Sequence, residues 1–366
     1  MGHVRARGED VRKYIIENVE QFPSKISKKA AEKFKITRQA VNKHLRRLTN
    51  EKFLTEAGET RNRVYKLVPL SEWTKDYQIG DLQEDIVWRN DIAPHLGELP
   101  DNVRNIWLFA FTEMFNNAQD HSGGTRVVVR IKKTAANTDM FIVDNGVGIF
   151  RKIQKAMNLL DERHAVLELA KGKLTTDPAN HSGEGIFFTS RMFDDFSIIS
   201  GGVAFSHEFG KEEDWILERN PRDGTGVFMQ LHNHTARTTK KVFDQFSSDE
   251  EDYRFTKTVV PVRLAQYGDD QLVSRSQAKR LLARVELFKI VLFDFQEVPT
   301  IGQAFADEIF RVFANRHPEM ELHAINASSE VKRMIERAKS GVAANVKGPK
   351  EASAPTAVQS GVEKAS

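Results

Sequence analysis

Residues 113–122, EMFNNAQDHS, place acids, amides and a histidine directly after the apolar run IWLFAF at 106–111. A helix over 101–121 would bury one apolar side and bring Glu113, Asn117 and His121, spaced by four residues, onto another side. A buried helix with one polar stripe usually faces a cleft. The sequence therefore predicts that this helix forms one wall of a cleft, although a solvated polar helix end gives the same local pattern.

The polar stripe carries groups suited to phosphate chemistry. Glu113 offers a carboxylate that can act as an acid or a base. Asn117 offers a neutral amide oxygen, which is a hard ligand suited to Mg²⁺. Asn116 falls off the stripe, and we expect it to be structural.

Two glycine-rich stretches further along the chain fit the same interpretation. In DMFIVDNGVGIF, residues 139–150, a strand ends in Asp144, whose carboxylate can accept a hydrogen bond from an exocyclic amine, and two glycines follow it. In HSGEGIFFTSRMFDDF, residues 181–196, Gly183 and Gly185 precede a helix whose first amides would point back toward the loop. Such a helix N-terminus suits phosphate.

Together these stretches resemble the GHKL family of ATP-binding domains, which includes type II topoisomerase ATPases, a heat-shock chaperone, sensor histidine kinases and mismatch-repair proteins. Residues 113–121 resemble the N box, residues 144–148 the G1 box and residues 183–186 the G2 box. Gly224 and Thr225, before the alternating strand GVFMQLH, resemble the closing strand of the family. The similarity spans about 105–235 and implies an α/β sandwich of the Bergerat type.

The resemblance implies specific roles in binding ATP and Mg²⁺. Asp144 would hydrogen-bond the adenine amino group, directly and through water shared with Thr225, and Asn117 would ligate magnesium between the phosphates. The glycines expected to line the nucleotide are Gly146, Gly148, Gly183 and Gly185. Residues 150–181 would form a mobile lid. Its basic residues, which we expect to be mostly solvated, are Arg151, Lys152, Lys155, Lys171 and Lys173.

Glu113 leaves the chemistry open. In hydrolytic relatives this position activates water, and in kinase relatives it helps to orient the acceptor or the metal. No stretch resembles the dimerisation helix of a histidine kinase, and EMFNNAQDH is closest to the pattern of anti-sigma-factor serine kinases. We therefore treat Glu113 as the candidate catalytic residue of either an ATPase or a serine/threonine kinase.

The composition of the first 68 residues predicts a separate domain with a basic charge. Residues 1–66 contain 17 Lys and Arg against 8 Asp and Glu, although the whole chain has a net charge of only +3. Such local charge favours a polyanionic partner for this module alone. Helices over 9–22, 26–34 and 38–50, followed by two strands around Gly58, match the winged helix-turn-helix pattern.

The third helix of this module has a face suited to a DNA major groove. Arg and Lys pair with guanine edges and phosphates, whereas Asn and Gln pair with adenine. The candidate DNA-binding residues are Arg38, Gln39, Asn42, Lys43 and Arg46 on the helix, with Arg61 and Arg63 on the wing. The alternative is a solvated helix face within a protein-interaction winged helix.

Residues 241–340 alternate strands and helices, which predicts a small α/β layer. The stretch resembles STAS-like domains, which are similar to the antagonists that the serine kinases phosphorylate. Antagonists carry a serine-containing turn after such a strand. Here the corresponding segment is PTIGQAF, residues 299–305, in which Thr300 is the only hydroxyl. We therefore expect a structural or partner-binding role for this domain.

The remaining segments complete a multidomain α/β chain. Residues 69–104 are expected to connect the first two domains, and residues 341–366, which are small, polar and proline-containing, to be disordered. The chain has no cysteine and no apolar run long enough to span a membrane, so we expect a cytoplasmic protein.

The expected function is that of an ATP-binding, DNA-binding transcriptional regulator, in the form of a homodimer, whose Mg-ATP state controls conformation or oligomerisation. The alternative is a serine/threonine protein kinase of a partner-switching pathway. The sequence leaves open whether ATP is hydrolysed, transferred or only bound.

Overall fold

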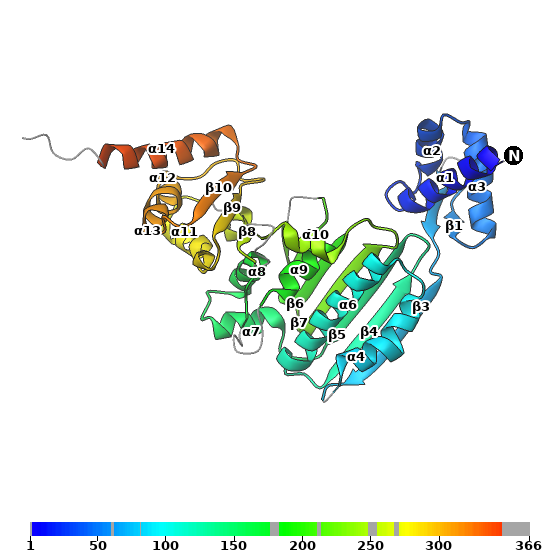
Figure 1. The fold of residues 1–366 in the computed structure, drawn as a ribbon, viewed down its shortest axis with the longest axis horizontal. Helices are drawn as coiled ribbons and strands as arrows, with labels where there is room; N and C mark the ends of the chain where they lie inside the picture. Colours follow the sequence, from blue (N-terminus) through cyan, green and yellow to red (C-terminus); the bar gives the residue numbers. More distant parts are fainter. Residues whose placement is uncertain are drawn as a thin grey trace, which may run out of the picture.

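The computed structural model describes residues 2–59, 62–80, 82–175, 183–210, 214–247, 255–266 and 271–345. Figure 1 shows three bodies in a row, with the N-terminal domain at one end, a large sheet in the middle and the C-terminal domain at the other end. The chain is a mixed α/β protein, as expected. Among the described residues, no helix is both long and apolar enough to cross a membrane.

The N-terminal domain consists of three helices and a hairpin. Helices α1 (Gly2–Asn18), α2 (Ile26–Phe34) and α3 (Arg38–Asn50) precede strands β1 (Leu54–Ala57) and β2 (Val64–Leu67), which pair antiparallel. Thr37 caps α3, because its Oγ1 accepts a hydrogen bond from the Ala40 amide at 3.2 Å. Apolar residues at helical spacing, among them Ile15, Val41 and Leu45, are buried and form a core of their own.

The middle domain is built on a five-stranded sheet in the order β3-β4-β5-β7-β6, with every neighbouring pair antiparallel. The strands are β3 (Ser71–Gln78), β4 (Arg126–Lys133), β5 (Asn137–Asp144), β6 (Asp195–Glu208) and β7 (Asp214–His232). Alternate residues of β5 are buried, with Met140 and Ile142 in the core and Phe141 and Val143 exposed. The buried face packs against α6 (Asp101–Asn116) and α9 (Gly185–Met192).

The segment 69–104 is not the connector that we expected. Strand β3 is an edge strand of the middle sheet, and α4 (Glu84–Val87), π-helix η2 (Trp88–Ile92) and α5 (Ala93–Leu96) pack against its core. The ring of Tyr77 meets that of Phe115 at 5.6 Å, and Trp88 meets Phe111 at 5.8 Å. These aromatic rings bury too much apolar surface for the segment to remain a solvated linker.

The expected lid, 150–181, folds mainly into two helices, α7 (Ile149–Ala156) and α8 (Glu162–Lys171). Residues 176–181 lie outside the described part of the chain. Helix α10 (Thr239–Asp244) also belongs to the middle domain, because its Phe243 packs on Phe109 and Phe188. The boundary between the second and third domains therefore falls after this helix and not at residue 240.

The C-terminal domain has a parallel three-stranded sheet in the order β10-β9-β8. Its strands are β8 (Lys257–Pro261), β9 (Ile290–Asp294) and β10 (Glu321–Ile325), and its helices are η4 (Val262–Ala265), α11 (Arg275–Leu282), η5 (Val285–Leu287), α12 (Gln303–Asp307), η6 (Glu308–Phe313), α13 (Ala314–Arg316) and α14 (Ser329–Asn345). We did not identify β8 from the sequence, because the strand is short and carries few signals of its own.

Helix α14 extends five residues into the segment that we expected to be disordered. Its buried residues Val331, Ile335 and Ala338 hold it against the domain. Alanines at 343 and 344 are strong helix formers, which favours the continuation of the helix to Asn345. Residues 346–366 lie outside the described residues.

Candidate functional site

One cavity of about 280 Å³ brings together residues from all the stretches that the sequence singled out. Its wall comes from the end of α6, from π-helix η3 (Asn117–His121), from the end of β5, from Thr225 and Val227 within β7 and from the start of α9. The predicted site residues on this wall are Glu113, Asn117, Asp144, Gly183, Gly185 and Thr225, and His121 of the polar stripe also lines it. Segments more than a hundred residues apart in sequence thus share one hollow.

The polar stripe of α6 reaches the cavity through a change of helix type. The α-helix ends at Asn116 and widens into a π-helical turn from Asn117 to His121. The widened turn is held from outside, because Lys152 Nζ donates to the carbonyl oxygen of His121 at 2.8 Å. Single π turns are frequent at functional sites. The regular spacing that we predicted therefore stops at Asn117, although all three stripe residues still face the cavity.

Asp144 is the buried carboxylate of the site. Its side chain is only 7% exposed, and its Oδ1 accepts hydrogen bonds from the amide of Gly146 at 2.8 Å and that of Thr225 at 3.2 Å. Burial raises the pKa of Asp144, and the hydrogen bonds from Gly146 and Thr225 counter part of that rise. The donors fix the carboxylate at the cavity wall, where it can accept from a ligand.

Glu113 lies directly against the first turn of α9. A Cβ placed on Gly185 would meet Glu113 Oε2 at 1.8 Å, so any larger residue would force the Glu113 side chain to move. Gly183 has a φ of +72°, and a Cβ there would meet the backbone of Leu174. These two glycines therefore bring the N-terminal end of α9 and the Glu113 carboxylate to the same side of the cavity.

Gly146 and Gly148, which we predicted to line the nucleotide, allow close packing around the loop after β5. Neither is among the described residues that line the cavity. A Cβ on Gly146 would meet the Ser122 carbonyl oxygen at 2.2 Å, and Gly148 has a φ of +90° beside the Ser200 side chain. The pair lets the loop after β5 pass close to η3 and β6, so it supports Asp144 from behind.

Apolar side chains form much of the remaining wall, and we did not predict them as site residues. They come from the inward faces of α6, α7, α9 and strands β5, β6 and β7: Met114, Ile142, Ile153, Ile186, Ile198 and Val227. The only sequence signal was the buried face of each element, which is shared with the whole core. An apolar hollow with a few fixed polar groups is typical of a small-molecule site.

The basic residues expected on a solvated lid are largely held by the protein. Lys155 is exposed, but Lys152 is half-buried and bonded to the His121 carbonyl. Lys171 is only 1% exposed, which contradicts the expectation of a solvated lid surface. The physical reason is that α8 packs against β8 and η4 of the C-terminal domain, which covers its outer side.

A metal ion at this site would need help from a ligand. Within the described ranges, no cluster of three or more His, Asp or Glu side chains could hold a metal ion. Magnesium is often held by one or two protein oxygens together with substrate phosphates. Asn117 and Glu113, both on the cavity wall, fit that arrangement.

The candidate DNA-binding residues lie in the separate N-terminal domain. Arg38, Gln39, Lys43 and Arg46 are exposed on α3 and, among the described residues, make no side-chain hydrogen bond or ion pair. Asn42 Oδ1 accepts from Ser27 at 2.9 Å, and the Arg63 guanidinium lies 3.3 Å from Glu56. Arg61 lies outside the described residues.

Comparison with known proteins supports only the third domain. A family model for a STAS-like domain of unknown function (DUF4325) matches residues 277–332, which run from α11 into α14. The C-terminal domain is therefore STAS-like. No curated protein matches the chain.

Proposed function

We propose that this protein is an ATP-binding, DNA-binding transcriptional regulator whose middle domain has the GHKL fold and binds Mg·ATP. The observation that carries the proposal is the convergence of Asp144, Asn117 and the glycine-bounded start of α9 on one cavity. A buried carboxylate, an amide oxygen and a helix N-terminus match an adenine amine, a metal ion and a phosphate chain respectively.

Each group has a defined task in this proposal. Asp144 accepts from the adenine amine while Thr225 and Gly146 hold its carboxylate. The apolar walls exclude water from the two faces of the base. Asn117 would hold the metal ion, which supplies charge neutralisation to the phosphates when bound. The direct test is a titration with Mg·ATP. We expect Asn117→Ala to bind Mg·ATP more weakly than wild type. The proposal is wrong if wild type does not bind Mg·ATP.

Gly185→Ala is expected to displace the Glu113 carboxylate while the domain stays folded, because the clash falls on the end of a flexible side chain. If Glu113 activates water, phosphate release from ATP should fall by about 100-fold or more, the scale of a lost general base. Gly80→Ala, where a Cβ would meet nothing within 4 Å, is the matched control. Unchanged phosphate release in a folded Gly185→Ala protein would contradict a catalytic role for Glu113.

The N-terminal domain, interpreted as a winged helix, provides the proposed DNA contact. Arg46→Ala is expected to weaken DNA binding and to reduce the slope of log affinity against log salt by about 1, if its guanidinium meets a phosphate. Arg89→Ala removes the same charge from an exposed position on η2 of the middle domain and should leave the slope unchanged. Equal effects of the two variants would contradict DNA recognition by α3.

The structure offers a route from the cavity to the N-terminal domain. The turn between β4 and β5 sits in that domain, where Ala136 is 2% exposed within its core and Asn137 Nδ2 donates to Glu20 Oε2 at 3.1 Å. Strand β5 then runs to Asp144 on the cavity wall. ATP can control DNA binding only if it binds two conformations of the protein with different affinity. Identical DNA affinity with and without Mg·ATP would contradict control of DNA binding by ATP.

A serine/threonine kinase is the second candidate. The observation in its favour is that Thr300 is exposed in the loop after β9 of the STAS-like domain. A kinase predicts transfer of label from ATP to a partner protein or to Thr300, lost in Asn117→Ala. Release of free phosphate alone would point to hydrolysis, and unchanged ATP would leave it as a bound ligand.

A further inference from the structure

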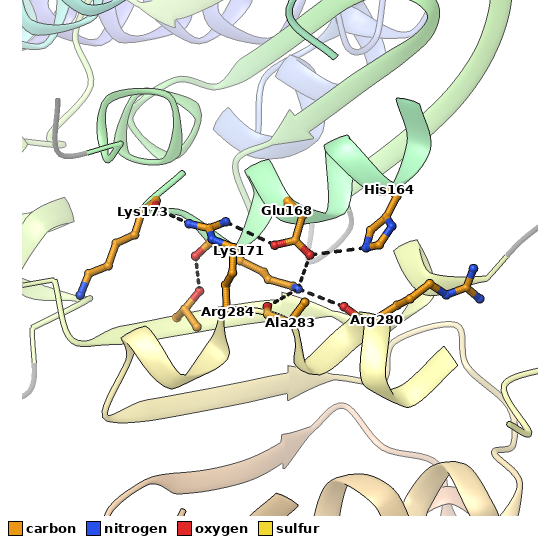
Figure 2. A network of polar contacts seen from close by, with 8 residues as sticks. His164, Glu168, Lys171, Lys173, Arg280, Ala283 and Arg284 are labelled. Atoms are coloured by element: carbon orange, nitrogen blue, oxygen red, sulfur yellow. Dashed lines mark hydrogen bonds and ion pairs between the residues drawn. The ribbon is translucent and has the colours of Figure 1, made fainter. Parts of the chain in front are cut away.

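Helix α8 of the middle domain ends in a polar junction with the STAS-like domain (Figure 2). Lys171, the last residue of the helix, is 1% exposed. Its Nζ donates to Glu168 Oε1 at 2.7 Å, to the carbonyl oxygen of Ala283 at 2.7 Å and to that of Arg280 at 3.3 Å. An ammonium group has three protons to donate, and here each has an acceptor. Two of the acceptors belong to the STAS-like segment.

The backbone after Lys171 is held by the same domain. Thr258 Oγ1, from β8, donates to the carbonyl oxygen of Lys171 at 2.6 Å. Arg284 donates to the carbonyl oxygen of Lys173 and pairs with Glu168 Oε2 at 3.3 Å. Lys173 Nζ in turn donates to the carbonyl oxygen of Leu287 at 3.0 Å. Residues 171–173 are therefore fixed from outside their own domain.

These fixed residues lead directly into the cavity. Leu169, on α8, and Leu174 and Thr175, just after the junction, line its wall. The Leu174 amide donates to the carbonyl oxygen of Gly183 at 3.0 Å, and Gly183 is itself a wall residue. The peptide group between Lys173 and Leu174 is therefore held on both sides, by Arg284 at its carbonyl oxygen and by Gly183 at its amide.

We infer that the STAS-like domain controls nucleotide binding in the middle domain by positioning the wall segment 171–175, with Arg284 as the positioning residue. The inference rests on the proposed ATP site and adds its regulation. Partial undocking would take the Ala283 and Arg280 carbonyls from Lys171 before water could replace them, so intermediate positions are disfavoured and the junction is either made or broken. A protein partner that draws the STAS-like domain away from α8 would release the wall and weaken nucleotide binding.

The test compares Arg284→Ala with wild type in the full chain, using a fluorescent ATP analogue with Mg²⁺ and hydrogen exchange at residues 173–175. Arg284→Ala is expected to raise the dissociation constant about tenfold, within the usual range of coupling between sites, and to speed exchange of these amides even without nucleotide. Lys279→Ala, an exposed charge on α11, is the matched control. Arg284→Lys keeps one donor without the guanidinium fork and should recover part of the affinity.

Each outcome has one meaning. If wild type binds the analogue and Arg284→Ala binds it equally well, the inference is wrong while the ATP site stands. If wild type does not bind the analogue, the proposed function is wrong. Unchanged hydrogen exchange at residues 173–175 in Arg284→Ala would contradict the positioning role of Arg284. Should Arg284→Ala fail to fold, Lys173→Met removes the donor to Leu287 and is expected to raise the dissociation constant two- to threefold. Equal affinity of that variant and wild type would overturn the inference.

Discussion

Lys171→Met is expected to lower the free energy of unfolding by about 3–5 kcal/mol, the usual loss when one partner of a buried ion pair is removed. The variant keeps the length of the side chain but leaves the carbonyl groups of Ala283 and Arg280 without their donor. Glu168, which is fully buried, would keep only Arg284 at 3.3 Å and His164 at 3.6 Å. Urea denaturation followed by tryptophan fluorescence measures the loss.

Two further variants make this prediction specific. Lys155→Met changes an exposed lysine on α7 and should alter stability by less than about 0.5 kcal/mol. Glu168→Gln combined with Lys171→Met removes the buried negative charge as well, so it should recover part of the lost stability. A single variant at 171 that is as stable as wild type would contradict the buried network in Figure 2.

Asp144→Asn is expected to weaken ATP binding by about 10- to 150-fold, which corresponds to the 1.5–3 kcal/mol of one hydrogen bond to a charged group. The amide oxygen can still accept from Gly146 and Thr225, so the loop after β5 should keep its shape. Its NH₂ group, however, would face the adenine amine with a donor where an acceptor is needed. Calorimetric titration with Mg·ATP measures the change.

The same variant has the opposite effect on stability. Burial raises the pKa of Asp144 above its ordinary value of 3.8. The stability that this group contributes is present below that value and is lost as the pH rises through the raised pKa. At neutral pH, Asp144→Asn without nucleotide should therefore be at least as stable as wild type, and the difference should shrink on acidification. A less stable variant at pH 7 would contradict the burial effect.

Asp139 provides the matched control on the same strand. It lies on the opposite face of β5, where Gln230 Nε2 donates to its Oδ1 at 2.8 Å, and burial also raises its pKa. Asp139→Asn should share the stability gain but bind ATP as wild type does. ATP affinity in wild type should fall as the pH drops toward the raised pKa of Asp144, because protonation removes the acceptor. Equal loss of affinity in both variants would contradict a direct contact with Asp144.

Local patterns gave the elements that carry the site. The apolar spacing of α6, the strand before Asp144 and the glycines before α9 could each be predicted, because one element's own periodicity and backbone limits produce them. Six of the predicted catalytic and nucleotide-binding residues also meet in one cavity. Whether they bind ATP remains a prediction.

Other features depended on partners far away in the sequence. Strand β3 becomes part of the middle sheet only through its pairing with β4, and β8 gains its place by pairing with β9. Gly146 is required by the carbonyl oxygen of Ser122 and not by the cavity, a fact that no local spacing reveals.

Local sequence patterns were enough to predict the order of the three domains, the polar stripe on α6 and the carboxylate at the end of β5. The burial of Lys171 and the hold of the STAS-like domain on one wall of the cavity arise only from the packing of one domain on another. The periodicity of apolar residues shows which side of a helix or strand is buried. A lysine at a helix end, by contrast, is buried only if another domain supplies hydrogen-bond acceptors for its ammonium group.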